Sequence, residues 1–368
     1  MDHETFRKTE ALIDLDAIRA NYAMACKLAP KSKNVAVIKA DAYGHGMLRV
    51  AEALQDVVPA FAVAILDEAL ELRKESISTP ILVLEGVNST DAIETAVANS
   101  LSLVVHSEEQ VSLMQQARLS TPVSIWLKVD TGMHRLGLSP TQLVPVLERL
   151  RDCTCDISVV CTHLASADDK TSDVTRLQLE VFEACASGLG LQLSIANSAG
   201  ILAWPESHAD WNRPGYMLYV DSPMASDIET ARGLQPAMTF RSEIIAIREI
   251  AVGEAVGYGG RWTATRPSKI GTVACGYADG YPRHAPNGTP TLVNGHVAPL
   301  VGTVSMDMIT IDLTEHENVA VGDSVELWGT GLPVDTIACA AGTIGYELLT
   351  GVTSRVPRRY YNNSNLHK

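Results

Sequence analysis

The sequence of 368 residues lacks the features that would place it in several large classes of protein. No stretch approaches 18 uninterrupted apolar residues, so no membrane span is expected. The N-terminal residues 1–10 are charged and do not resemble a secretory signal. No GxGxxG motif follows a predicted strand and no GxxxxGKS/T motif occurs, so dinucleotide and ATP sites have no support.

Paired cysteines and an excess of positive charge are also missing. The seven cysteines are scattered, odd in number and without a CxxC pair, which favours reduced thiols in a cytoplasmic protein with no metal site. Lysine and arginine number 29 against 43 acidic residues, a formal charge of -14. Such a chain repels phosphate backbones, so nucleic acid is not an expected partner, although a local basic pocket for one small anion is compatible with it.

The first part of the chain alternates short apolar runs with helical patterns. This alternation predicts βα units and a parallel sheet. Eight such strands favour a (β/α)₈ TIM-like barrel, with a doubly wound open sheet as the structural alternative. The predicted strands cover residues 34–39, 60–66, 80–84, 101–105, 123–129, 157–162, 191–196 and 211–219.

After residue 232 the helical pattern mostly stops, which predicts a mostly β C-terminal domain over residues 233–368 behind a barrel domain over residues 1–232. Asn294-Gly295 lies between two apolar runs and predicts a type I′ hairpin. One late helix is expected around residues 335–349. The early apolar run 11–15 is a candidate to pair with this second domain.

Several chemically capable residues fall where the predicted barrel strands end, which is where such barrels place their active sites. Each of them alone has a plain structural explanation, as a solvated lysine, a surface ion pair or a core histidine. Their convergence on one rim points instead to a site. The residues are Lys39, Tyr43, Lys128, Arg135, His163, Ser198 and Arg213.

Lys39 ends the apolar run Val-Ala-Val-Ile, so we expect a desolvated side chain. Desolvation lowers the pKa of a lysine and leaves the neutral amine that forms an imine with a carbonyl group. Ser198, Tyr43 and the Gly215 backbone are candidates to bind a phosphate. Pyridoxal 5′-phosphate satisfies both requirements, because it carries a carbonyl and a phosphate.

At this point the sequence resembles the alanine racemase family, over nearly the whole chain. The most specific segment is Ala36–Gly46 (AVIKADAYGHG), which is similar to the family's pyridoxal-lysine signature. Further segments follow in the family's order: LKVDTGMHRLG (127–137), CTHLASAD (161–168), ANSAG (196–200), NRPGYMLYV (212–220), VGYGGRWTA (256–264), GYADGYPR (276–283) and VGTVSMDM (301–308).

The resemblance implies a head-to-tail homodimer with shared active sites and a two-base mechanism. Lys39 then holds the cofactor and is the base for the D-side proton. Tyr258 of the β domain is the second base, reaching the cofactor of the other subunit and serving the L side. A racemase needs a base on each face, because a proton leaves one face and returns to the other.

The resemblance also assigns the remaining site residues. Arg213 faces the pyridine nitrogen; since an arginine stays protonated, it cannot donate a proton as an acid would, which favours racemisation over transamination. His163 lies behind the ring and links Tyr258 with Arg213. The implied phosphate set is Tyr43, Ser198, Gly215 and Tyr216. Arg135 and the Met306 backbone amide contact the substrate carboxylate, Asp307 follows Met306, and Lys128, which is carbamylated in some members, orients Arg135.

The chain departs from the family at three positions. Ser354 stands where a tyrosine is common at the inner entrance, and Thr303 stands where an arginine is frequent, while Asp168 and Arg283 keep other entrance positions. Ser194 stands where some members carry a histidine near Arg213. The two small entrance residues suggest a wider gate that admits substrates larger than alanine, serine first, unless neighbouring side chains refill the gap.

The sequence therefore predicts an alanine racemase that supplies D-alanine for peptidoglycan. The alternative is a serine or broad-specificity racemase of the same fold. A decarboxylase of this architecture normally needs an acidic partner for the pyridine nitrogen, where Arg213 stands here. A small barrel of pyridoxal-phosphate homeostasis lacks the second domain that this chain has.

Overall fold

The computed structural model describes residues 6–224 and 228–362. The first five residues of the charged N-terminal segment lie outside the described residues. The chain divides into two compact units. We call residues 6–18, 43–46 and 235–362 the β unit and residues 19–42, 47–224 and 228–234 the barrel unit.

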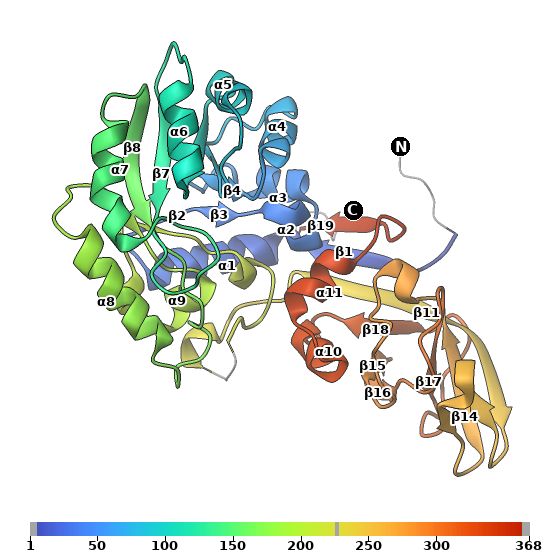
Figure 1. Ribbon diagram of the computed structural model, residues 1–368. Helices are drawn as coiled ribbons and strands as arrows, with labels where there is room; N and C mark the ends of the chain where they lie inside the picture. Colours follow the sequence, from blue (N-terminus) through green and yellow to red (C-terminus); the bar gives the residue numbers. More distant parts are fainter. Residues whose placement is uncertain (1–5, 225–227, 363–368) are drawn as a thin grey trace. The chain divides into compact units, whose positions relative to one another are not determined.

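The barrel unit is built on a parallel sheet whose strands follow one another along the chain (Figure 1). The first strand position is split at Val35 into β2, which pairs with β10, and β3, which pairs with β4, so the sheet closes on itself. The strands are β2 (Lys33–Asn34), β3 (Ala36–Val37), β4 (Phe61–Val63), β5 (Ile81–Val83), β6 (Leu101–Val105), β7 (Val123–Lys128), β8 (Cys155–Cys161), β9 (Gln192–Ser194) and β10 (Trp211–Asn212). The predicted barrel is confirmed.

Helices separate these strands, and most of the helices expose one face to solvent. Ser89 and Ser107 accept hydrogen bonds from the first turns of two of them, satisfying backbone N–H groups that a helix start leaves free. The helices are α1 (Leu15–Leu28), α2 (Lys39–Gly44), α3 (Met47–Leu54), α4 (Leu66–Lys74), α5 (Thr90–Ala98), α6 (Glu108–Gln116), α7 (Leu143–Leu150), α8 (Val174–Ala186) and α9 (Ser198–Ala203). Short 3₁₀ turns are η1 (Pro140–Gln142), η2 (Pro205–Ser207), η3 (Tyr216–Leu218) and η4 (Glu229–Ala231).

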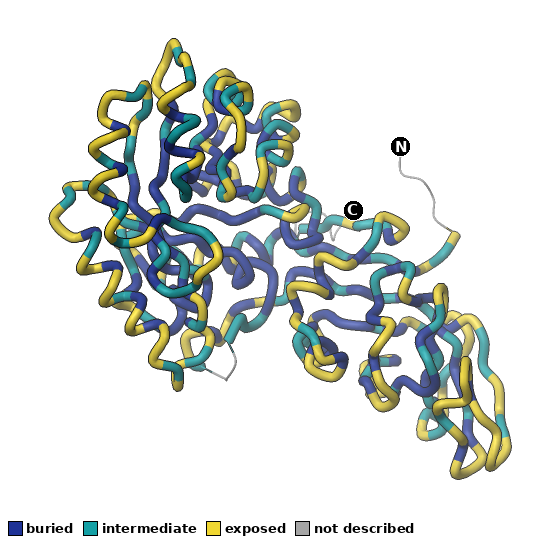
Figure 2. The backbone as a smooth tube through the Cα atoms, in the orientation of Figure 1, coloured by how far each residue is buried: buried dark blue, intermediate teal, exposed yellow. Residues whose placement is uncertain are grey.

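Burial explains why the central strands read as continuous apolar runs. Every residue of β4 and β5 is buried, as expected for parallel strands covered on both faces, and Figure 2 shows buried backbone along the sheet. The last predicted strand, 211–219, is shorter than expected. It ends at Asn212 because Pro214 lacks a backbone N–H for the ladder and a 3₁₀ turn begins at Tyr216.

The β unit is organised around the long strand β11, which changes partners at a bulge between Ile244 and Ala246. One half pairs with β1 and β18 and the other half with β14. The early run predicted at 11–15 forms β1 and pairs with β11 and β19. The strands are β1 (Glu10–Asp14), β11 (Met238–Ile250), β12 (Ala255–Val256), β13 (Trp262–Thr263), β14 (Ser268–Val273), β15 (Pro290–Val293), β16 (His296–Pro299), β17 (Ile309–Asp312), β18 (Ser324–Trp328) and β19 (Arg358–Tyr361).

Two local predictions in this unit have different outcomes. The hairpin is confirmed: Asn294 and Gly295 both have positive φ between β15 and β16. The single late helix is wrong, because Gly342 adopts a left-handed conformation with φ of 71° and ends α10. The segment is instead α10 (Val334–Ala341) and α11 (Gly345–Gly351). The 3₁₀ turns η5 (Tyr258–Gly260) and η6 (Tyr277–Asp279) complete the unit.

Candidate active site

Four cationic or imidazole side chains lie where barrel strands end. Lys39 follows β3, Lys128 is the last residue of β7, His163 follows β8, and Arg213 follows β10. The structure brings these four residues and Arg135 into one electrostatic neighbourhood, because each of Lys39, Lys128 and His163 is affected by the charges of others in the group. The carboxyl-terminal rim of the barrel is therefore locally positive in a strongly acidic chain.

Lys39 has the environment expected of a neutral amine. Burial lowers the pKa of Lys39, and the charge of Arg135 lowers it further, while Glu85 and Glu68 act in the opposite direction. A larger fraction of the side chain is then unprotonated near neutral pH than for an exposed lysine. The amine is suited to nucleophilic addition to a carbonyl carbon or to accepting a proton.

The backbone that follows Lys39 is left-handed over four consecutive residues without a glycine. The φ angles of residues 40–43 are 53° to 54°, a conformation that costs about 1–2 kcal/mol per residue for L-amino acids. Side chains stabilise this turn: Glu68 Oε1 accepts from the Ala40 N–H at 2.6 Å, and Asp41 Oδ1 accepts from the Met47 N–H at 2.7 Å. Strain of this kind is concentrated at functional sites.

The guanidinium of Arg213 is buried and held by groups from two neighbouring strands. It donates to Ser194 Oγ on β9, to the Thr162 carbonyl after β8, and to the Ile195 carbonyl at 3.0 Å. Burial lowers the pKa of Arg213, yet an arginine remains protonated at any physiological pH. The side chain thus presents a fixed positive charge, and Ser194, one of the three departures from the family pattern, is one of its hydrogen-bond partners.

His163 is a neutral imidazole in this setting. Burial lowers its pKa well below the ordinary value, and the charges of Arg213 and Lys128 lower it further. Its backbone is anchored by Gln178, whose Nε2 donates to the His163 carbonyl at 3.0 Å and to Thr131 Oγ1 at 3.3 Å. Gln178 therefore connects the loops that follow β7 and β8.

Sequence reasoning missed Gln178. Its signal was present, because it is a polar residue on the buried face of the amphipathic helix α8, where an apolar side chain is usual. A buried amide in such a place has to be hydrogen-bonded, and here its Oε1 also accepts from the Ala165 N–H at 2.8 Å.

Ser198 lies at the start of α9 and gathers backbone groups of the segment that follows β10. Its Oγ accepts from the Gly215 N–H at 3.0 Å and from the Met217 N–H at 3.1 Å. Because the oxygen uses its lone pairs for these bonds, the hydroxyl proton remains a donor for an anionic oxygen. Tyr216, also predicted to contact phosphate, is buried. It lies in the sequence between Gly215 and Met217, whose N–H groups donate to Ser198.

Arg135 is exposed and lies in a loop whose conformation is set by Asp130. Asp130 Oδ1 accepts from the backbone N–H groups of Gly132, Met133 and His134 at 3.0 to 3.1 Å. The second oxygen, Oδ2, contacts His134 Nδ1 at 3.1 Å. Asp130 is thus committed to its own loop and not to Lys128. Asp168, the entrance residue of this unit, is exposed in the loop after β8.

The other predicted site residues belong to the β unit. Tyr258 lies in η5 with 74% of its side chain exposed, between Gly257 and Gly259, which have φ of 72° and 74°. Thr303, predicted at the entrance, donates from Oγ1 to the Tyr258 carbonyl at 3.0 Å. The hydroxyl therefore fixes the backbone of the predicted second base.

The β unit also holds Tyr43 and the remaining entrance and substrate residues. Tyr43 is buried, with its ring centroid 6.0 Å from that of Tyr346, and burial raises its pKa. Met306 and Asp307 are exposed in the loop before β17. Arg283 and Ser354 are exposed as well. The predicted site residues are thus divided between the two units.

The described residues contain neither a metal-binding cluster nor a helix that could span a membrane. Among residues 6–224 and 228–362, no group of three or more histidine, cysteine, aspartate or glutamate side chains could hold a metal ion. In the same part of the chain no helix has the length and hydrophobicity needed to cross a bilayer.

Comparison with known proteins gives matches along both units. The family model described as "Alanine racemase, N-terminal domain" matches residues 13–223, and "Alanine racemase, C-terminal domain" matches residues 237–360. A protein named "Alanine racemase" from Chromohalobacter salexigens is 50% identical over 352 residues, which is 95% of this chain and 97% of the relative.

Solved structures agree with these matches. The biosynthetic alanine racemase from Pseudomonas aeruginosa superposes with a TM-score of 0.94 at 49% identity, over 97% of this chain and 100% of the other. The alanine racemase from Bartonella henselae, with covalently bound pyridoxal phosphate, has a TM-score of 0.86 at 31% identity, over 96% and 99% of the two chains.

Proposed function

The chain belongs to the alanine racemase family, and from this premise we propose that it interconverts L-alanine and D-alanine with pyridoxal 5′-phosphate as cofactor. The observation that carries the proposal is the half-buried Lys39, with its lowered pKa, among the cationic groups of the barrel rim and inside the Ala36–Gly46 signature. The chemistry is that of an isomerase, since no atom is gained or lost between the two enantiomers.

The residues of the rim fit this cofactor. Lys39, Lys128, Arg135 and Arg213 are cations or potential cations with few carboxylates near them, so the site calls for an anion. Ser198 keeps a donor for a phosphate oxygen, next to the Gly215 and Tyr216 segment. Tyr43 completes the proposed phosphate set. The cofactor, when bound, supplies a carbonyl carbon for covalent attachment and an electron sink for the α-carbon.

The groups of the chain then have distinct tasks. Lys39 would hold the cofactor covalently and, as the neutral amine that its surroundings favour, move the proton on the D side of the α-carbon. Arg213, fixed by three hydrogen bonds, would face the pyridine nitrogen and keep it unprotonated. His163, neutral beside Arg213, would lie behind the ring and connect Arg213 with Tyr258.

The substrate side is assigned to residues of both units. Arg135 and the Met306 amide would bind the alanine carboxylate, with Lys128 orienting Arg135 and Asp307 supporting Met306. Tyr258 would move the proton on the L side. Asp168, Arg283, Thr303 and Ser354 would line the entrance.

We further propose a homodimer in which Tyr258 serves the cofactor of the partner subunit, with barrel and β domains divided at residues 232 and 233. Support comes from the exposed apolar and aromatic side chains that gather on linked turns of the β unit: Tyr258, Tyr277, Met306 and Met308. Exposed patches of this kind mark interaction surfaces. A cytoplasmic location and a role in supplying D-alanine for peptidoglycan complete the proposal.

A chiral assay of the purified, pyridoxal-phosphate-loaded protein against a panel of L-amino acids tests the proposed function. We expect conversion of L-alanine to D-alanine, with Lys39→Ala inactive and Lys170→Ala, a change at an exposed lysine, active. An active Lys39→Ala variant, or a wild type that leaves alanine untouched, contradicts the proposal. Conversion of serine at a comparable kcat/KM would favour the broad-specificity alternative. The small residues Ser354 and Thr303 at the predicted entrance are the observation that supports this alternative.

A further inference from the structure

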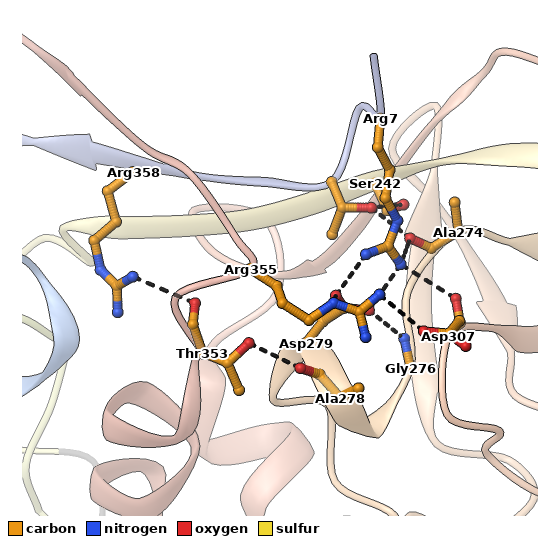
Figure 3. Close-up of polar contacts among 11 residues, drawn as sticks. Arg7, Ser242, Ala274, Gly276, Ala278, Asp279, Asp307, Thr353, Arg355 and Arg358 are labelled. Atoms are coloured by element: carbon orange, nitrogen blue, oxygen red, sulfur yellow. Dashed lines mark hydrogen bonds and ion pairs between the residues drawn. The ribbon is translucent and has the colours of Figure 1, made fainter. Parts of the chain in front are cut away.

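The carboxylate of Asp279 is completely buried, and it joins segments that are far apart in the sequence (Figure 3). Arg7 binds both of its oxygens, Nη1 donating to Oδ1 at 2.5 Å and Nη2 to Oδ2 at 2.7 Å. The Gly276 N–H donates to Oδ2 at 2.9 Å, and Arg355 Nε lies 3.6 Å from Oδ1. We call Arg7, Asp279 and Arg355 the Asp279 cluster.

Both arginines of the Asp279 cluster also hold Asp307 (Figure 3). Arg7 Nη2 donates to the Asp307 carbonyl at 3.2 Å, and Arg355 Nη2 donates to Asp307 Oδ1 at 2.8 Å. The backbone and the side chain of Asp307 are therefore bound from two directions. Arg7 is itself fixed by its forked contact with Asp279, which restricts geometry more strongly than a single hydrogen bond does.

The turn that contains Asp279 holds the peptide groups on each side of Met306. The Tyr277 N–H donates to the Ser305 carbonyl at 3.0 Å, and the Ala278 N–H donates to the Met306 carbonyl at 2.9 Å. The approach is close, because a Cβ atom at Gly276 would lie 2.4 Å from both carbonyl oxygens. The turn and the loop are therefore joined by two backbone hydrogen bonds and close packing.

These contacts determine where the Met306 N–H points. In a trans peptide the carbonyl of one residue and the N–H of the next point in opposite directions. Since the Ser305 carbonyl points at the turn, the Met306 N–H points away from it. Within the described residues this N–H has no hydrogen-bond acceptor, so it is available to a ligand.

We propose that the Asp279 cluster is a positioning device that aims the Met306 amide at the carboxylate of the substrate. The inference rests on the proposed function, which assigns the substrate carboxylate to that amide, and deepens it by naming the residues that set the direction of the amide. It also assigns a role to the N-terminal segment, because Arg7 precedes β1 in the sequence and contacts Asp307.

The test compares Arg7→Met and Arg7→Lys holoenzymes with wild type. Arg266→Met is the matched control, because it removes an exposed arginine paired with the exposed Glu315 of the same unit. We expect Arg7→Met to raise KM for both L- and D-alanine by about tenfold while kcat stays within about twofold. The inhibition constant of propionate, a carboxylate without the amino group, should rise by the same factor as KM. Arg7→Lys should fall between, because lysine keeps the charge and loses the fork.

Other results overturn the inference. Unchanged KM and unchanged propionate inhibition in folded Arg7→Met contradict it, and so does a fall in kcat alone. Should Arg7→Met fail to fold, Asp307→Asn gives the same readout, since it weakens the Arg355 contact at an exposed position. A wild type that does not racemise alanine refutes the proposed function instead. Propionate affinity, measured by calorimetry, then still decides whether the cluster positions a carboxylate site.

Discussion

At the scale of single residues, the chemistry of the site follows from the desolvation of titratable side chains that lie near other cations. Lys39, Lys128 and His163 all have lowered pKa values, and burial is the largest cause for each. Neighbouring cations add to the effect in every case. The rim therefore favours neutral bases, which a proton-transfer enzyme needs, and it attracts an anionic ligand to balance the remaining positive charge.

Lys128 leads to a prediction about covalent modification. Among residues 6–224 and 228–362 it has no ion-pair partner, and the nearby carboxylate of Asp130, two residues along the chain, is bound to its own loop. A neutral amine adds to the carbon of CO₂ and releases one proton, which yields a carbamate anion. That anion would pair with Arg135 and offset the positive charge of the rim.

We therefore expect the holoenzyme in ¹³C-labelled bicarbonate at mildly alkaline pH to show a carbamate carbon by nuclear magnetic resonance. The signal should disappear in Lys128→Ala and persist in the control Lys170→Ala. A wild-type spectrum without a carbamate carbon contradicts the prediction and leaves Lys128 as an unmodified amine.

At the scale of elements, the loop over residues 353–355 is held in place on both sides of Ser354 (Figure 3). The Thr353 N–H donates to the Asp279 carbonyl at 3.2 Å, Thr353 Oγ1 donates to the Ala278 carbonyl at 2.8 Å, and Arg355 belongs to the Asp279 cluster. A change of the exposed side chain at 354 therefore alters local volume without moving the backbone.

Because the backbone is anchored, Ser354→Tyr tests whether the size of the side chain at this position limits the size of the substrate. We expect the larger side chain to lower the ratio of kcat/KM for serine over alanine by about tenfold, because it narrows the passage for the larger substrate. Ser354→Ala is the control, since it removes the hydroxyl and keeps the residue small. A ratio that Ser354→Tyr leaves unchanged would show that other side chains already fill the space.

Elements also show where local patterns are reliable. The Asn294-Gly295 hairpin was predictable because a two-residue turn needs positive φ at both positions, which these residues tolerate. The late helix was predicted too long because apolar periodicity continues past Gly342, while the glycine adopts the left-handed conformation that ends α10. Periodicity reports burial, and it does not report where one buried helix stops and the next begins.

At the scale of the whole molecule, the predicted site residues are divided between the two units, and the proposed homodimer is what would complete each site. We expect that a Lys39→Ala chain mixed with a Tyr258→Phe chain regains activity, because one site of each heterodimer then has both bases. Purified heterodimers should reach about half of the wild-type rate, since one of two symmetric sites is intact.

The controls for this complementation are the two variants alone, each of which should be inactive in both directions, because every conversion uses one base to remove a proton and the other base to return one. Affinity tags of different kinds on the two chains allow the heterodimer to be isolated and its composition verified. Heterodimers that are demonstrated by this means and show no recovery would contradict shared active sites.

The sequence by itself determined the parallel barrel, the β-rich second part and the family, because alternating apolar periodicity and ordered motifs are local properties of a chain. It also pointed to Lys39, His163 and Arg213, since strand ends meet on one rim of a barrel.

Only the tertiary structure decided what surrounds those residues. Gln178 joins two loops from a helix, Ser194 and two carbonyls hold Arg213, and Arg7 reaches Asp279 across 272 residues of sequence. Contacts of that separation leave no periodic trace in the chain. They arise because buried charges and amides must find partners once the apolar surfaces have packed, and the fold determines which partners are within reach.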